Sequence, residues 1–178
     1  MSRDVRIVRL EETMPANDYE FVTNWKVAAP AELVFDILKQ GGEYARWWPE
    51  VYLNCQTVPS GSPDGLGDKV ILLTRGKLPY KLRWTATSIR IVPPKLIEIE
   101  ASGDFVGRGT WTLTPGNDGT DIRFDWILRA DKPLIKILSP LLKPVFKWNH
   151  RWAMERGYES LLREIKRRTE ALSASAAS

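Results

Sequence analysis

The feature that most constrains the fold is a succession of short strand-like segments in the middle of the chain. Between residues 51 and 130, stretches of alternating apolar and polar residues are separated by turns rich in glycine and proline. This pattern predicts six strands, at 51–58, 68–76, 79–92, 95–102, 104–114 and 120–130. Connections this short cannot hold the crossover that parallel strands need, so consecutive strands should pair antiparallel.

The segments on either side of this meander complete an α+β architecture. Residues 19–28 alternate as one further strand, and 31–48 hold two short helical segments separated by Gly41 and Gly42. Residues 144–172 carry apolar side chains at helical spacing along one stripe. The sequence therefore predicts a curved, seven-stranded antiparallel sheet, two short helices after the first strand, and a long C-terminal helix packed across the sheet over a cavity.

The last hairpin indicates which residues face the interior. A turn at 115–120 places four pairs on one face: Leu113 with Ile122, Trp111 with Phe124, Gly109 with Trp126, and Gly107 with Leu128. A glycine opposite a tryptophan is a match of size, because the indole covers the bare backbone. The inner face is therefore predicted to be aromatic. Within 79–92 the apolar residues switch from one face of the strand to the other near Thr87 and Ser88, which predicts a β-bulge there.

The composition excludes several classes of chemistry. The 178 residues include one cysteine, Cys55, and one histidine, His150. They therefore form neither an intrachain disulfide nor a zinc site of Cys and His ligands. The sequence contains no phosphate-binding glycine-rich motif and no G-x-S-x-G nucleophile motif. We expect no metal and no cofactor, and the eight tryptophans favour binding over chemistry.

The net charge of +4 is mild and does not by itself indicate nucleic acid, so we expect no nucleic-acid partner. The N-terminus alternates charged and aliphatic residues and never forms the apolar core of a signal peptide. We therefore expect a cytoplasmic protein.

One basic segment stands out. Residues 132–147 contain four lysines, three prolines and no acidic residue. The prolines predict short pieces rather than a regular helix. Two interpretations remain open, a cationic lid that makes transient contact with an anionic membrane surface, and a loop that only covers the sheet.

A sheet that faces a single helix is hard to fill completely, which favours an internal cavity for a small hydrophobic molecule. The candidate ligand-binding residues are Trp25, Trp84, Trp111, Phe124, Trp126, His150, Met154 and Tyr158. The alternative is a fully packed aromatic core. Gly157 lies on the buried stripe of the last helix, where a glycine suits close approach of the helix backbone to the sheet or to a ligand.

His150 and Asp104 are the candidate catalytic residues. His150 has a side chain that titrates near neutral pH, and its place on the helical stripe turns it toward the sheet. The alternative for His150 is a structural hydrogen bond. Asp104 shares the outer-face parity of Arg108, which favours a surface ion pair; an irregularity at Gly103 would instead bring Asp104 to the cavity mouth.

Several segments, in this order, resemble the START/Bet v 1-like (SRPBCC) superfamily, particularly its polyketide cyclase/dehydrase branch. They are Asn-Trp-Lys-Val-Ala-Ala-Pro-Ala-Glu-Leu-Val-Phe-Asp-Ile-Leu at 24–38, Trp-Trp-Pro at 47–49, Gly-Asp-Phe-Val-Gly-Arg-Gly-Thr-Trp-Thr-Leu at 103–113, and Asn-His-Arg-Trp-Ala-Met-Glu-Arg-Gly at 149–157. The resemblance covers about residues 19–170. It implies a helix-grip fold that encloses an apolar cavity and holds hydrophobic small molecules there.

The sequence thus predicts a ligand-binding domain at 19–172, preceded by an extension at 1–18 and followed by a disordered tail at 173–178. Its expected role is to store, transport or sense a small hydrophobic or amphipathic molecule. One alternative is a cyclase or dehydratase that acts on an aromatic or polyketide-like substrate through His150 or Asp104. A second is a peripheral lipid carrier that docks on membranes through residues 132–147.

Overall fold

Seven strands form one antiparallel sheet in the order β1-β7-β6-β5-β4-β3-β2. The computed structural model describes residues 18–104, 106–129 and 133–176, and their side chains except those of residues 18, 129, 133–143 and 176. The strands are β1 (Asp18–Val27), β2 (Tyr52–Val58), β3 (Lys69–Arg75), β4 (Lys81–Val92), β5 (Leu96–Gly103), β6 (Val106–Gly116) and β7 (Gly119–Arg129). These bounds agree with the predicted strands to within about two residues.

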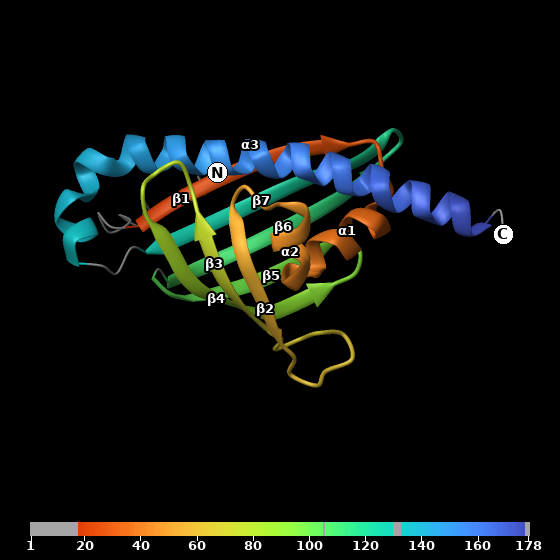
Figure 1. The fold of residues 1–178 in the computed structure, drawn as a ribbon, viewed down its shortest axis with the longest axis horizontal. Coiled ribbons are helices and arrows are strands. Elements are labelled where there is room, and N and C mark those ends of the chain that lie inside the picture. The colour runs from red at the N-terminus through yellow and green to blue at the C-terminus, as the bar shows by residue number, and fades with distance from the viewer. Residues whose placement is uncertain (1–17, 105, 130–132, 177–178) are drawn as a thin grey trace, which may run out of the picture.

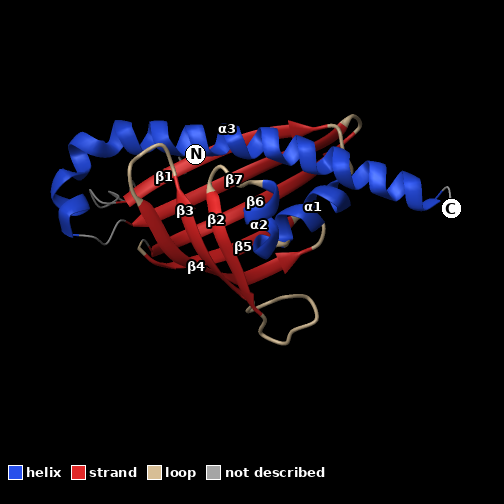
Figure 2. Cartoon of the chain, in the orientation of Figure 1, coloured by secondary structure: helices blue, strands red, loops and turns tan. Residues whose placement is uncertain are grey.

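The helices lie between and beside the strands. After β1 come α1 (Ala31–Lys39), the 3₁₀ turn η1 (Gly41–Glu43) and α2 (Tyr44–Trp47), and after β7 comes α3 (Pro133–Ala176). Figure 1 shows α3 running along the curved sheet. Figure 2 shows α1 and α2 near the C-terminal half of α3. The predicted α+β helix-grip architecture is confirmed.

The predicted register of the last hairpin is also confirmed. Trp111 lies opposite Phe124, and Gly109 lies opposite Trp126 in the β6–β7 ladder. A Cβ atom added at Gly109 would lie 2.6 Å from the indole of Trp126, so only glycine leaves room for that ring. This register puts the large aromatic side chains on the face toward α3.

The β-bulge is confirmed within a residue or two of its predicted place. The pairing of β4 with β5 shifts between Ser88 and Arg90. The shift reverses the facing of the strand, so Trp84 before it and Ile91 after it both pack on the core. A bulge of this kind bends the sheet, which curls toward α3.

The C-terminal helix differs from the prediction at both ends. It begins at Pro133 instead of 144, so the segment 133–147 is helical and is not broken into short pieces. Proline is favoured in the first turn of a helix, and further along it bends a helix without always ending it. Figure 1 shows the first turns of α3 curving away from the line of the rest. At the other end the helix continues through Ala176, so residues 173–176 of the expected disordered tail are helical.

Candidate functional site

A cavity of about 240 Å³ lies between the concave face of the sheet and α3. This is far more than the roughly 10–15 Å³ that one water molecule requires. Its walls come mainly from β3, β4 and β7, with residues of β1, β5 and β6, from α2 and the start of β2, and from residues 146–154 of α3. Most of the lining is apolar, so the space suits an apolar molecule better than water.

Four aromatic side chains from three strands form the floor of the cavity. The rings of Trp111 and Phe124 stack with centroids 4.0 Å apart, Phe124 and Trp126 follow at 5.5 Å, and Trp126 and Trp84 at 5.6 Å. The indole N–H of Trp84 donates to the hydroxyl of Thr74 at 3.1 Å, so this buried polar group is satisfied within the wall. The result is a closely packed aromatic wall that can make apolar contacts with a bound molecule.

His150 lies at the side of the cavity, as its helical position predicts. Its imidazole stacks on Phe21 with centroids 4.3 Å apart, and its Nε2 lies 3.5 Å from the hydroxyl of Thr23. Burial lowers the pKa of His150 from 6.5 to about 4. The side chain is therefore neutral at pH 7, and it can donate or accept a single hydrogen bond without carrying charge.

Asp104 lines the rim of the cavity instead of pairing with Arg108 on the outer face. Gly103 has a φ of +120°, a left-handed conformation that glycine adopts readily, and the chain turns there. One carboxylate oxygen of Asp104 accepts the backbone N–H of Arg83 at 2.8 Å and so holds the start of β4. Arg108 pairs with Glu98 at 3.2 Å. The geometry thus follows the alternative in which an irregularity at Gly103 redirects Asp104.

Of the predicted ligand-binding residues, Trp84, Trp111, Phe124, Trp126, His150 and Met154 meet around the cavity. Trp25 and Tyr158 do not line it. Trp25 packs between Trp48, Trp111 and Tyr158, with ring centroids 6.2, 5.4 and 5.9 Å away. The Tyr158 hydroxyl donates to the carbonyl of Lys26 at 2.8 Å. Parity places these side chains on the inner face, but the neighbouring aromatic rings close the space around them.

Among the lining residues that sequence reasoning missed, one aromatic group comes from α2 and the start of β2. Trp48, Tyr44 and Tyr52 line the cavity near α1, and the Tyr44 hydroxyl donates to the carbonyl of Leu38 at 2.6 Å. The signal for them was the Trp-Trp-Pro sequence at 47–49, which indicates an aromatic cluster but not the direction of its rings. Trp48 also explains Gly157, since a Cβ added there would lie 2.2 Å from the Trp48 ring. The close approach of α3 is to Trp48, and neither the sheet nor a ligand requires it.

The basic segment 132–147 lies partly outside the residues whose side chains are described. Within the part that is described, Phe146 lines the cavity and meets Tyr19 edge-on with centroids 5.4 Å apart. Lys147 is exposed. Phe146 therefore borders one end of the cavity from a helix, a position that fits both the lid and the covering interpretation of this segment.

Among the described residues no group of three or more His, Cys, Asp and Glu side chains is arranged to hold a metal ion. Burial raises the pKa of Cys55 to about 11, which leaves the thiol protonated and unreactive at neutral pH. Across the described part of the chain, no helix is both long and apolar enough to cross a membrane.

Comparison with known proteins agrees with this architecture. Residues 19–170 match the family model described as "Polyketide cyclase / dehydrase and lipid transport". None of the curated proteins matches the chain in sequence.

Three solved structures illustrate the likeness of fold. The Zhui aromatase/cyclase from Streptomyces sp. R1128 has a TM-score of 0.67 at 17% identity over 85% of this chain and 96% of that one. A START superfamily protein from Mycobacterium smegmatis has 0.67 at 18% identity, over 83% and 97%. The di-domain aromatase/cyclase BexL of the BE-7585A biosynthetic pathway has 0.64 at 16% identity over 84% of this chain, which spans about half (52%) of that protein's length.

Proposed function

The chain belongs to the polyketide cyclase/dehydrase and lipid transport family, and from that premise we propose that it binds a small hydrophobic or amphipathic molecule in the cavity between the sheet and α3. The observation that carries this proposal is the apolar cavity of about 240 Å³ with its stacked aromatic floor. The wall is formed by Trp84, Trp111, Phe124, Trp126 and Met154. A preformed apolar site needs little ordering on binding, which lowers the entropic cost that burial of the ligand must offset.

We assign His150 the role of a polar anchor. Its imidazole is neutral and touches the cavity, and it offers one hydrogen bond to a hydroxyl or carbonyl of the ligand. A general base works best when its pKa lies near the operating pH. With a pKa of about 4, His150 is a weak base, which favours binding over proton abstraction.

A cavity-filling variant tests the proposal. Ala153 lines the cavity from α3, so Ala153→Phe should occupy part of the space and weaken binding of a retained apolar compound by at least about tenfold. The matched control is Ala171→Phe, the same change on an exposed position of the same helix. Native mass spectrometry of the purified protein, followed by denaturing extraction, would identify that compound, and a fluorescence titration would give its affinity. Equal affinity in both variants would refute the site.

The second candidate is a cyclase or dehydratase, and the observation in its favour is that His150 and Asp104 line the same cavity. His150→Gln separates the two functions, because glutamine keeps a hydrogen-bonding group but cannot take up a proton. A binding protein should keep its affinity within about fivefold. An acid–base enzyme should lose turnover of the identified compound by roughly 10²–10⁴-fold.

A further inference from the structure

The cavity ends at a surface that is both basic and aromatic. The turn after β3 meets the first described turns of α3, where the backbone N–H of Lys77 donates to the side-chain oxygen of Asn149 at 2.8 Å. Gly76 allows this contact, since a Cβ there would lie 2.1 Å from the same oxygen. Figure 1 shows this turn arching up to α3. Gly76, Tyr80, Phe146 and Asn149 all line the cavity, so the junction forms its mouth.

Large apolar side chains are exposed at this junction. Trp148 is 49% exposed, and Tyr80 and Val145 are 39% and 36% exposed. The ammonium group of Lys77 lies 5.5 Å from the centre of the Trp148 ring, within the range of a cation–π contact. Exposed tryptophan and tyrosine beside lysine is the combination found where proteins meet the headgroup region of a bilayer.

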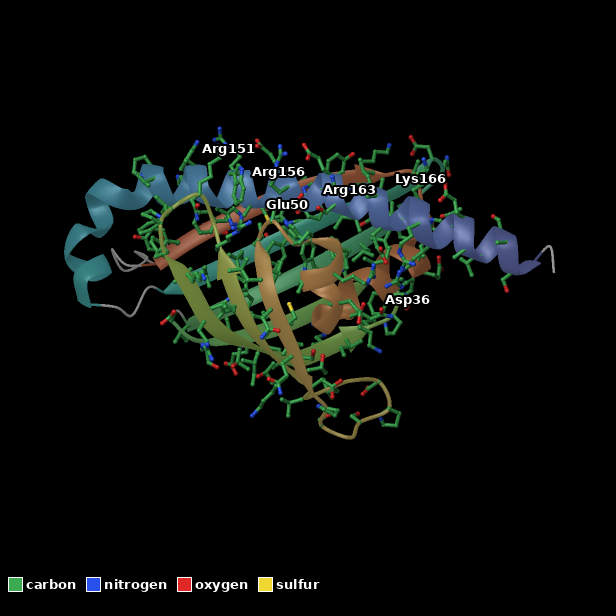
Figure 3. All side chains as sticks on the ribbon, in the orientation of Figure 1. Asp36, Glu50, Arg151, Arg156, Arg163 and Lys166 are labelled. Carbon is green, nitrogen blue, oxygen red and sulfur yellow. The ribbon has the colours of Figure 1, made fainter. Side chains whose placement is uncertain are left out.

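The two stretches of chain that meet at this junction carry only basic charged residues. The stretch 69–97, which contains the turn, and the stretch 132–151 contain no acidic residue. Lys77, Lys147 and Arg151 are exposed, and Figure 3 shows Arg151 on the outer side of α3. The first acidic residue further along α3 is Glu155. We call the set Lys77, Tyr80, Val145, Lys147, Trp148 and Arg151 the mouth face.

We propose that the mouth face docks the protein on an anionic lipid bilayer, with the cavity opening toward the membrane. The cations meet the negative surface potential, while Trp148, Tyr80 and Val145 enter the interface. An acidic protein would satisfy the cations equally well, but it would give no special role to a half-exposed tryptophan and valine beside them. This docking has a role only if the cavity binds an apolar ligand, as proposed above, because the membrane is where such a ligand would enter the cavity.

Vesicle flotation tests this directly. The full chain is mixed with vesicles of phosphatidylcholine alone, or with about one third phosphatidylglycerol added. We expect binding to the anionic vesicles only, and loss of that binding as salt rises from about 0.01 M to about 1 M, where the Debye length falls from about 30 Å to about 3 Å. Absence of binding to anionic vesicles at low salt overturns the proposal. Equal binding to both kinds of vesicle overturns its electrostatic part.

Two variants locate the surface. Lys77→Glu/Lys147→Glu should weaken binding to anionic vesicles by at least about tenfold, because each cation near the surface contributes separately. Lys95→Glu/Lys166→Glu makes the same change of net charge at exposed positions outside the mouth face and should bind as the wild type does. Trp148→Ala should weaken binding by about fivefold without altering the salt dependence. If both double variants lose binding equally, net charge alone explains the effect and the mouth face is wrong.

The proposed cavity function is tested separately in the same samples. The Lys77→Glu/Lys147→Glu protein should bind the retained apolar compound with unchanged affinity, because neither lysine lines the cavity. Loss of vesicle binding with intact cavity binding supports the docking surface. Intact vesicle binding with no cavity binding refutes the proposed function but not the docking. Binding of a soluble acidic protein with no binding to either vesicle would make the mouth face a protein interface and overturn the proposal.

Discussion

The two ends of the space between α3 and the sheet are built from the same kinds of residue, yet one end is filled and the other is open. At the filled end Trp25 packs against Tyr158 and against Trp48, which also borders the cavity, and Leu161 is fully buried. At the open end Trp84, Trp126 and their neighbours line a cavity. Tryptophan therefore does not by itself indicate either a packed core or a binding site.

What differs is how closely α3 approaches the elements below it. At the filled end Gly157 has no side chain, and the helix backbone comes down onto the Trp48 ring. At the open end two α3 side chains contact β1: Phe146 meets Tyr19 edge-on, and His150 stacks on Phe21. The small residue Gly157 lets α3 come close at the filled end. At the open end, the large side chains between α3 and β1 hold the helix away from the centre of the sheet.

Ion pairs reinforce the filled end. Glu164 on α3 is almost fully buried and accepts a bidentate pair of hydrogen bonds from Arg46 in α2, at 2.8 and 3.0 Å. Arg167 and Arg168 also donate to it. These hydrogen bonds hold the pKa of the Glu164 carboxyl well below its usual range. Figure 3 shows a second link, in which Arg163 reaches Glu50 at 3.2 Å.

The largest expected effect comes from removing this buried carboxylate. Glu164→Ala removes a buried carboxylate that accepts charge-assisted hydrogen bonds from three arginines, and we expect the free energy of unfolding to fall by about 3 kcal/mol. Urea denaturation followed by far-UV circular dichroism measures the change. The control is Glu170→Ala, whose exposed pair with Lys166 spans 3.9 Å and should contribute less than about 0.5 kcal/mol. Similar losses of unfolding free energy for both variants would contradict the expected difference between the buried and the exposed carboxylate.

The open end should respond to pH through His150. Because the pKa of His150 is about 4 in the folded protein and 6.5 without burial, the unfolded chain binds a proton first as the pH falls. The folded state should lose stability between about pH 6.5 and pH 4, by about 3 kcal/mol in total, with no contribution from this group above pH 7.

His150→Gln isolates that effect, because the variant cannot titrate there. The difference in unfolding free energy between wild type and variant should shift by about 3 kcal/mol in favour of the variant as the pH falls from 7 to 4. Parallel denaturant titrations at both pH values measure this shift. A constant difference would show that the imidazole remains solvated at the cavity wall.

The smallest expected effect compares two positions one turn apart on α3. Gly157→Leu forces a side chain into the Trp48 ring and should cost about 2 kcal/mol of stability through overpacking. Ala153→Leu extends into the cavity and should change stability by less than about 1 kcal/mol. Thermal denaturation of the two variants side by side gives the ranking. The reverse ranking would place the open space at the wrong end of the helix.

The strands and their register were predictable because they depend on local and pairwise rules. Turn residues limit each strand, and the turn before Gly119 fixes which residues of β6 and β7 face one another. The match of Gly109 to Trp126 and the bulge after Ser88 follow from the same alternation of side chains. Placing Trp84, Trp111, Phe124 and Trp126 on the inner face therefore needed no knowledge of the rest of the molecule.

The start of α3 and the direction of Asp104 could not be predicted in that way. The prolines of 133–147 suggested a broken segment, but a helix bent by proline remains possible when its turns can pack on the sheet. Asp104 follows Gly103 in the turn between β5 and β6, where the positive φ of that glycine takes it out of the strand alternation. Both outcomes depend on neighbours that are distant in the sequence.

By itself, the sequence determined the order of the elements, the antiparallel sheet, the bulge and the aromatic character of its inner face. Only the tertiary structure decided which of those aromatic side chains fill space and which enclose it. Alternation along a strand assigns a side chain to a face, but the volume above that face depends on how closely a separate element approaches. Here that distance is set by Gly157 on Trp48 at one end and by His150 on Phe21 at the other.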